Sequence, residues 1–121
     1  MLHFLIEHFQ TNLPEMIARQ RLFTSQLRSI FHEYKQSQII RSGDDLMDAE
    51  AKISVSIATV SPVSSLIHFG INISSKNTPV LTRGLNDYQI DWKEFAQKSI
   101  ETYTHEDQSM KHALTKVRWV H

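Results

Sequence analysis

Two runs of alternating residues constrain the fold of this chain more than any other feature. Residues 52–60 read "KISVSIATV" and residues 66–74 read "LIHFGINIS". Because successive side chains of a strand point to opposite faces, each run predicts a strand with one apolar face and one face of small or polar residues. The connection through Pro62 is short, so we expect the two strands to be neighbours in one sheet.

The remaining sequence alternates further strand patterns with helical ones. We expect strands at residues 2–9, at "QIIR" (38–41) and at 46–60, where the chain turns around "DAEA". Helices are predicted at 14–36, capped by Asn12 or Thr11; at "DWKEFAQKSIETY" (91–103), capped by Asp91; and separately at "HEDQSMKHALTKVRWV" (105–120). The "SKNTP" stretch (75–79) is predicted to be loop.

This order of elements predicts the fold class and the domain organisation. A strand, a helix, several strands and then helices are typical of an α+β fold with a mainly antiparallel sheet packed by helices. A chain of 121 residues suits a single domain, 1–121, with one modest core. Within the 91–103 helix we expect Trp92, Phe95 and Ile100 to face that core.

Composition narrows the functional classes. Thirteen basic residues balance thirteen acidic ones, so the basic excess of a nucleic-acid-binding domain is absent and no nucleic-acid partner is expected. The chain has no cysteine, which removes disulfides, thiol catalysis and cysteine-zinc sites. The first segment, "MLHFLIEHFQ", has neither the basic start of a signal peptide nor the length of a membrane span. We therefore expect a cytoplasmic protein without a membrane partner.

Six small or polar positions are predicted to form a floor on one face of the two central strands. The apolar faces would pack under helices, which would leave this second face on the other side of the sheet. The floor residues are Lys52, Ser54, Ser56, His68, Gly70 and Asn72.

Two interpretations of this floor stay open. Many antiparallel sheets simply expose one face to water. Against that, serine and glycine leave space above the backbone, and glycine within a strand often marks the close approach of a ligand. A lysine beside such a space supplies a positive charge and three hydrogen-bond donors, which suit a carboxylate or phosphate.

The central segment resembles that of the lipoate- and biotin-protein ligases. The matching positions are the Asp45-Leu46 pair, then "KIS" at 52–54, Ala58, and the strand from His68 to Asn72. A longer match is to the family called domain of unknown function 366. Its pattern has counterparts here at residues 3–9, 19–22, 41–46, 52–68 and 116–118, which span nearly the whole chain.

The ligase resemblance implies a ligand and a set of roles. Such enzymes bind a small carboxylic acid and ATP, form an acyl-adenylate, and pass the acyl group to a carrier protein. By this resemblance Lys52 is the catalytic residue that contacts the carboxylate and the α-phosphate, where it would stabilise negative charge. Asp44 or Asp45 would orient Lys52 or hold Mg²⁺ near phosphate oxygens, and His68 and Asn72 would add polar contacts.

The sequence also departs from the ligase pattern. Lipoate ligases carry a loop rich in arginine and glycine that wraps the ligands, whereas the three glycines here, Gly43, Gly70 and Gly84, are far apart. No phosphate-cradling loop of a known type is present. The chain begins where the second third of the ligase fold usually begins, so an N-terminal segment of the fold is expected to be absent. An open sheet edge would then favour association with a second copy.

Other side chains have weaker claims on chemistry. His3 and His8 are five residues apart on a predicted strand, so they fall on opposite faces and no metal site is predicted. Arg41 either pairs with Asp44 and Asp45 or contacts a ligand. Arg19 is interpreted as part of a solvated helix face or a salt bridge.

Two functional hypotheses follow for this chain. In the first, a ligase-like or acyltransferase-like domain binds an acyl group, a carrier or a nucleotide around Lys52, with Arg41, Asp44, Asp45, Ser54, Ser56, His68, Gly70 and Asn72 as ligand-binding residues. In the second, a non-catalytic binding or assembly module keeps the fold without ligase activity. The missing loop favours the second hypothesis and the retained lysine favours the first.

Overall fold

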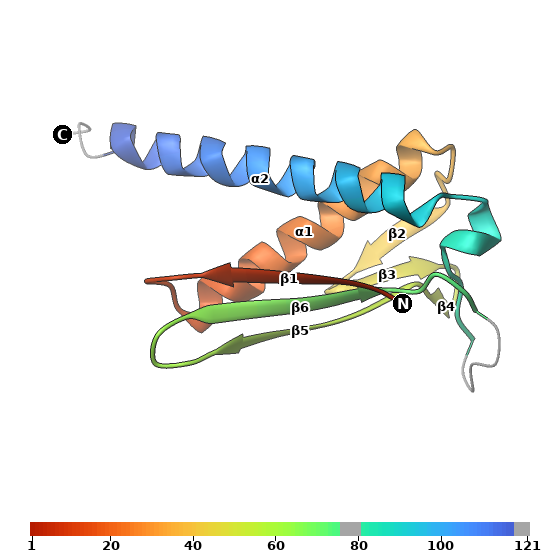
Figure 1. The fold of residues 1–121 in the computed structure, drawn as a ribbon, viewed down its shortest axis with the longest axis horizontal. Coiled ribbons are helices and arrows are strands. Elements are labelled where there is room, and N and C mark those ends of the chain that lie inside the picture. The colour runs from red at the N-terminus through yellow and green to blue at the C-terminus, as the bar shows by residue number, and fades with distance from the viewer. Residues whose placement is uncertain (76–80, 118–121) are drawn as a thin grey trace.

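The computed structural model describes residues 1–75 and 81–117 of the 121-residue chain. Both helices lie on the same side of the strands, with α1 crossing between α2 and the sheet layer (Figure 1). The elements, in chain order, are β1 (Leu2–His8), α1 (Leu13–Glu33), β2 (Ile39–Ser42), β3 (Asp45–Asp48), β4 (Ala51–Lys52), β5 (Ser54–Val60), β6 (Ser65–Ile71), the short 3-10 helix η1 (Leu85–Tyr88) and α2 (Trp92–Val117).

The strands form two small antiparallel sheets. The longer strands pair in the order β1-β6-β5, and the shorter ones in the order β2-β3-β4. The Ile53 amide, between β4 and β5, donates to the Leu46 carbonyl at 2.9 Å and so ties the two sheets together. The predicted α+β class with antiparallel pairing is therefore confirmed, and η1 is an element without a counterpart among the predicted ones.

Aromatic side chains fill the core between the helices and the long sheet. Phe23 of α1 is 1% exposed and meets Phe4, Phe69 and Tyr103 edge to face, with ring centroids 5.2, 5.2 and 5.6 Å apart. Edge-to-face pairs add to the hydrophobic gain from burying each ring. One aromatic residue of α1 thus joins β1, β6 and α2.

The predicted helix starts are confirmed by their caps. Asn12 Oδ1 accepts a hydrogen bond from the Glu15 amide at 2.8 Å, and Pro14 occupies the first turn of α1, where a missing amide hydrogen costs nothing. Asp91 Oδ2 accepts from the Glu94 amide at 3.2 Å at the start of α2.

The C-terminal helical region differs from the prediction. A single helix, α2, covers what the sequence suggested were two, because no glycine or proline lies between residues 91 and 117 to interrupt it. Phe95 faces the core as expected, but Trp92 and Ile100 are 41% and 55% exposed. Residues 76–79 of the predicted loop and 118–120 of the predicted last helix lie outside the described part of the chain.

The face prediction is confirmed for β6 and wrong for β5. Ile67, Phe69 and Ile71 of β6 are buried beneath the helices, as expected. On β5, however, Ser54 is buried while Val55 and Ile57 are 54% and 59% exposed. The alternation of buried and exposed residues shifts by one position where β4 ends and β5 begins, because the consecutive residues Ile53 and Ser54 are both buried. A shift of one residue exchanges the two faces of a strand.

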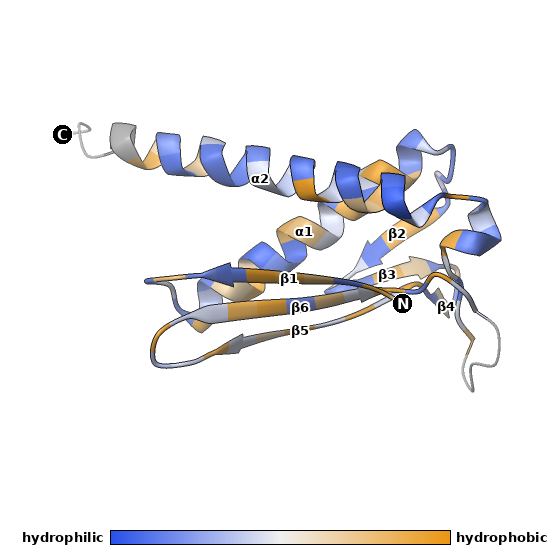
Figure 2. Cartoon of the chain, in the orientation of Figure 1, coloured by the Kyte–Doolittle hydropathy of each residue, from blue (hydrophilic) through white to orange (hydrophobic). Residues whose placement is uncertain are grey.

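One face of the β1-β6-β5 sheet therefore has apolar side chains that no described helix covers. The apolar colouring along these strands is visible in Figure 2. We call this surface the outer face. Its exposed apolar side chains are Leu5, Val55, Ile57 and Leu66.

Candidate functional site

A tight turn between β2 and β3 places the two predicted acidic residues. Gly43 adopts a positive φ of 64°, a conformation that glycine reaches without steric cost. Arg41 Nη1 donates to the Gly43 carbonyl at 2.7 Å and braces this turn. Arg41 is therefore engaged with the backbone of the turn, whereas Asp44 and Asp45 follow directly and lie at intermediate exposure.

Lys52 lies beside one of these carboxylates. Its Nζ is 3.3 Å from Asp45 Oδ1, and the two side chains are 47% and 31% exposed. The Lys52 backbone is held by residues 81–83: its amide donates to the Leu81 carbonyl at 3.2 Å and its carbonyl accepts from the Arg83 amide at 3.0 Å. A half-exposed ion pair of this kind contributes about 0–1 kcal/mol, so the amine can exchange Asp45 for another anion at little cost.

Ser54 and Ser56 point inward, away from the predicted floor. Ser54 Oγ accepts a hydrogen bond from the Leu46 amide at 3.0 Å in the buried layer between the sheets. Ser56 Oγ accepts from Gln20 Nε2 at 2.7 Å, and the same amide group donates to Asp44 Oδ2 at 3.2 Å. Ser54 thus joins β5 to β3, and Ser56 joins β5 to α1 beside the β2–β3 turn, so both serines have structural roles.

His68 and Gly70 lie on the opposite, outer face of the sheet. In the strand register Gly70 pairs with His3 on one side and with Val55 on the other. Ser54 and Ser56 pair instead with Ile71 and Phe69, which are buried. Directly paired residues share a face, so the predicted floor is divided between the two faces of the sheet.

A shallow hollow lies on the outer face around Gly70. Its volume is about 150 Å³. A methyl group on Gly70 would come within 2.5 Å of Met1 Sδ, so the missing side chain makes room there. The lining residues are Met1, His3, Val55, Ser56, Ile57, His68 and Gly70.

Asn72 connects the end of β6 to the segment that carries Lys52. Its Nδ2 donates to the Lys52 carbonyl at 3.3 Å and to the Arg83 carbonyl at 3.2 Å. Its backbone N–H donates to the Ile53 carbonyl at 3.0 Å. With its side-chain donors used in this way, Asn72 holds the Lys52 backbone and the segment around Arg83 in place.

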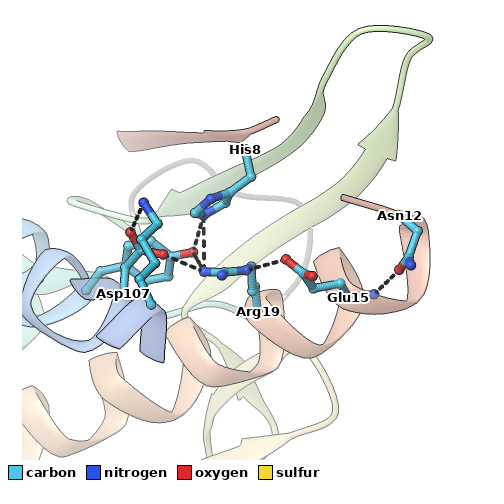
Figure 3. Close-up of polar contacts among 7 residues, drawn as sticks. His8, Asn12, Glu15, Arg19 and Asp107 are labelled. Carbon is cyan, nitrogen blue, oxygen red and sulfur yellow. Dashed lines mark hydrogen bonds and ion pairs between the residues drawn. The ribbon is translucent and has the colours of Figure 1, made fainter. Parts of the chain in front are cut away.

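A polar cluster that the sequence did not reveal lies on the helix side of the sheet (Figure 3). Arg19 of α1 lies at its centre: Nη1 donates to Tyr103 Oη and to Asp107 Oδ1, both at 3.0 Å, and Nε donates to Glu15 at 2.9 Å. The Tyr103 hydroxyl is 2.7 Å from His8 Nε2. These partners are up to 88 residues apart in sequence, so only the packing of α2 on α1 and β1 brings them together.

The electrostatics of this cluster fix its protonation. Burial and the neighbouring Arg19 guanidinium lower the pKa of His8 below its ordinary value of 6.5. Burial alone would raise the pKa of Asp107, but hydrogen bonds from Lys111 and Arg19 outweigh this effect and lower the pKa. Burial raises the pKa of Tyr103. The cluster thus contains neutral His8, neutral Tyr103 and a charged Arg19–Asp107 pair, which together clamp α2 to α1 and β1.

The acidic turn fits the donor set that a magnesium–nucleotide complex requires. Mg²⁺ bound with a nucleotide uses one or two carboxylates together with phosphate oxygens and water. Asp45 contacts the Lys52 amine and is the available carboxylate, whereas Asp44 Oδ2 accepts a hydrogen bond from Gln20 Nε2 of α1. Within the described ranges, 1–75 and 81–117, no three acidic or histidine side chains gather into a metal-binding group, so the phosphates would have to complete the coordination.

Comparison with known proteins identifies relatives of this fold. The family model described as "Domain of unknown function (DUF366)" matches residues 1–118. "Uncharacterized protein MJ0805" of Methanocaldococcus jannaschii is 37% identical over 91 residues, which are 74% of this chain and 41% of that protein. A solved structure, "Protein of Unknown Function from Pyrococcus horikoshi", has 32% identity and a TM-score of 0.89, over 98% of this chain and 64% of that one.

A more distant likeness concerns the fold alone. A mutant of the biotin protein ligase from Aquifex aeolicus, solved in complex with biotin, has a TM-score of 0.74 at 14% identity, over 91% of this chain and 51% of the ligase. The ligase-like fold predicted from the central segment is therefore confirmed. The chain spans less than two thirds of each of these relatives, and the predicted loss of an N-terminal segment stays a prediction.

Within the described residues, neither helix combines the length and the apolar character that crossing a membrane would require.

Proposed function

This chain belongs to the DUF366 family, and we propose that its ligase-like fold binds a small carboxylic acid, together with a nucleotide, around Lys52. The observation that carries the proposal is the pairing of the Lys52 amine with Asp45 at 3.3 Å, in a half-exposed position from which an anion can displace the carboxylate. Neither residue is locked in a buried network, unlike Arg19.

The outer face suits the body of such an acid. Val55 lines the hollow and is three residues beyond Lys52, a distance of about 10 Å along an extended chain. A ligand with an apolar tail and a carboxylate could place the tail over Val55, Ile57 and Gly70 and the carboxylate at the Lys52 amine. Phosphate oxygens would face the same amine, and the carboxylate of Asp45 through Mg²⁺.

The roles of the other predicted ligand residues change in this proposal. Gly70 and His68 contact the ligand body from β6, while Asn72 supports the Lys52 backbone through its 3.3 Å bond to the carbonyl. Arg41, Ser54 and Ser56 keep the turn and the strands in place, because their polar atoms contact protein groups. Lys52 is then the residue that stabilises negative charge on the carboxylate and the α-phosphate.

Isothermal titration calorimetry of ATP with Mg²⁺, with and without biotin or lipoate, tests the proposal. Wild type should bind, and Lys52→Ala should lose about tenfold or more in affinity, since a hydrogen bond to a charged group contributes about 1.5–3 kcal/mol. Lys98→Ala is the matched control, because Lys98 is 42% exposed and also pairs with a carboxylate. Absence of binding in wild type, or equal binding by Lys52→Ala, would contradict the proposal.

A second candidate function, assembly without catalysis, is favoured by the same outer face. Leu5 is 72% exposed and Ile57 59% exposed, and contiguous exposed apolar residues on a sheet mark interaction surfaces. We propose a second copy of this chain as the partner. If two outer faces stacked about a two-fold axis with antiparallel strands, Glu7 at one end of β1 would lie over His3 at the other end in the partner.

Sedimentation velocity separates this candidate from the first. A dimer of wild type that becomes a monomer in Ile57→Asp, but not in Thr102→Asp on the exposed side of α2, would support assembly through the outer face. A monomer at all concentrations, or a dimer unaffected by Ile57→Asp, would exclude it.

A further inference from the structure

Two histidines on neighbouring strands meet on the outer face. His3 of β1 and His68 of β6 lie diagonally across the strand pair, since His3 is opposite Gly70 and His68 is opposite Leu5. His3 Nδ1 is 2.9 Å from His68 Nε2, and the ring centroids are 5.0 Å apart with a tilt of 56°. Both side chains are exposed, so an ion from solution can reach them.

A thioether sulfur lies over the same spot. Met1 Sδ and His3 Nδ1 are 2.5 Å and 3.6 Å from the position that a Cβ on Gly70 would occupy. Because Gly70 has no side chain, this space is left to the Met1 sulfur and to His3 Nδ1. Met1, His3 and His68 all line the hollow around Gly70, so a thioether and two imidazoles converge there.

From this convergence we propose a binding site for a soft monovalent metal ion of the copper(I) type, held by His3 Nδ1, His68 Nε2 and Met1 Sδ. Two nitrogens about 2.0 Å from one ion and about 110–120° apart are separated by about 3.3–3.5 Å. The two imidazole nitrogens are 2.9 Å apart in their hydrogen bond, so small ring rotations that widen this separation by about 0.4–0.6 Å would admit the ion. Thioether and imidazole ligands together select copper(I) over hard cations.

Binding needs no external proton acceptor. Without metal, one of the two facing nitrogens donates to the other, so one of them carries a hydrogen. When the ion binds, that ring moves its proton to its other nitrogen and both facing nitrogens present lone pairs. Each imidazole stays neutral, no electron is transferred, and the single positive charge of the ion is the only charge added.

The surroundings disfavour a divalent ion. Val55 and Ile57 provide an apolar wall, and among the described residues that line the hollow there is no carboxylate to offset a second positive charge. A higher charge next to an apolar wall costs more solvation free energy. Copper binding does not involve Lys52, which is about 10 Å further along the chain, and it is tested without the acid, whose proposed tail would occupy the same hollow.

Anaerobic competition with the copper(I) chelator bicinchoninate tests the site. Wild type should bind one copper(I) ion. His3→Gln and His68→Gln should each weaken binding by more than the roughly tenfold loss that follows removal of an outer-shell partner. Gly70→Ala, whose added methyl displaces the Met1 sulfur, should also weaken it while both imidazoles remain. His105→Gln, which alters an exposed histidine on α2, is the control and should bind as wild type does.

Three results would overturn the proposal. The first is no stoichiometric binding by wild type. The second is full affinity in His68→Gln with loss in His3→Gln, which would mean that His3 binds the ion with backbone groups near residue 1 and without His68. The third is tighter binding of Zn²⁺ than of copper(I) in parallel titrations, which would assign the histidine pair to a harder ion.

Discussion

The Lys52 amine lies 3.3 Å from the Asp45 carboxylate, across the narrow β2-β3-β4 sheet, with both side chains partly in solvent. This pair differs from the Arg19–Asp107 pair, whose side chains are only 11% and 14% exposed and share further partners. The first pair can open to admit an anion, while the second holds two helices together. The proposed binding of an anion at Lys52 depends on that difference.

Asp45→Asn should strengthen the binding of a carboxylate ligand in the absence of Mg²⁺. Asp45 neutralises part of the Lys52 charge, so its removal frees the amine for a ligand anion. An exposed pair of this kind contributes about 0–1 kcal/mol, and the affinity should rise by about two- to fivefold. Calorimetry with EDTA present measures the change, and weaker binding would show that Asp45 supports the ligand directly.

Ser54→Ala should lower the free energy of unfolding, because Ser54 is buried and has a structural role. The substitution leaves the buried Leu46 amide without its 3.0 Å acceptor, which costs about 1–3 kcal/mol in the free energy of unfolding. Ser29→Ala, on the exposed side of α1, should change it by about 0.5 kcal/mol or less. Urea denaturation compares the two, and equal stabilities would refute the structural role of Ser54.

Gly84→Ala and Gly70→Ala should differ sharply in stability. A Cβ at Gly84 would lie 2.8 Å from the Ile73 carbonyl carbon and oxygen, which are backbone atoms that cannot move aside, so we expect a loss of about 1–3 kcal/mol. At Gly70 the obstructing atom is the end of the flexible Met1 side chain, so the loss should be small. Thermal melting of both variants decides this, and similar melting temperatures would count against close packing of Gly84 on the Ile73 backbone.

The stability of the fold should decrease with acidity in a window set by His8. The pKa of His8 is lowered in the folded state, so below pH 6.5 the unfolded chain binds a proton that the folded chain does not. The free energy of unfolding therefore falls as the pH drops through 6.5 toward the lowered value. Asp107, whose pKa is lowered from 3.8, contributes to the pH dependence of the free energy of unfolding only at more acidic pH.

His8→Gln isolates the contribution of His8 to this pH dependence. Denaturation at several pH values should show a shallower slope near pH 6 in this variant than in wild type. The control, Gln108→Ala, exchanges an exposed residue of α2 that carries no titratable group and should keep the wild-type slope. An unchanged slope in His8→Gln would mean that the Arg19 cluster does not hold His8 neutral.

The parts of the fold that could be predicted are those determined by local pattern. The uninterrupted alternation in β6 gives its faces correctly, and Asn12 with Pro14 marks the start of α1. The faces of β5 could not be predicted, because the change of phase at Ile53 results from the hydrogen bond of its amide to Leu46 in the neighbouring sheet. Without that contact the run from Lys52 to Val60 is indistinguishable from one continuous strand.

The candidate site was predictable only in part for a related reason. Lys52 and Asp45 are close in sequence, so a short turn brings them together. His3 and His68 are 65 residues apart, and Arg19 and Asp107 are 88 apart, so their contacts depend on which strands and helices pack together. The prediction that His3 and His8 lie on opposite faces was correct, but it did not indicate that His3 contacts His68 on β6.

The most direct test of ligand binding at Lys52 is a ¹H–¹⁵N correlation spectrum recorded during titration with Mg²⁺–ATP and a small carboxylic acid such as lipoate. If Lys52 binds these ligands, the amide signals of residues 44–57 and 66–72 should shift with a common dissociation constant, and these shifts should vanish in Lys52→Ala. Shifts confined to α2 and the Arg19 cluster, or an unchanged spectrum at saturating ligand, would contradict binding at Lys52.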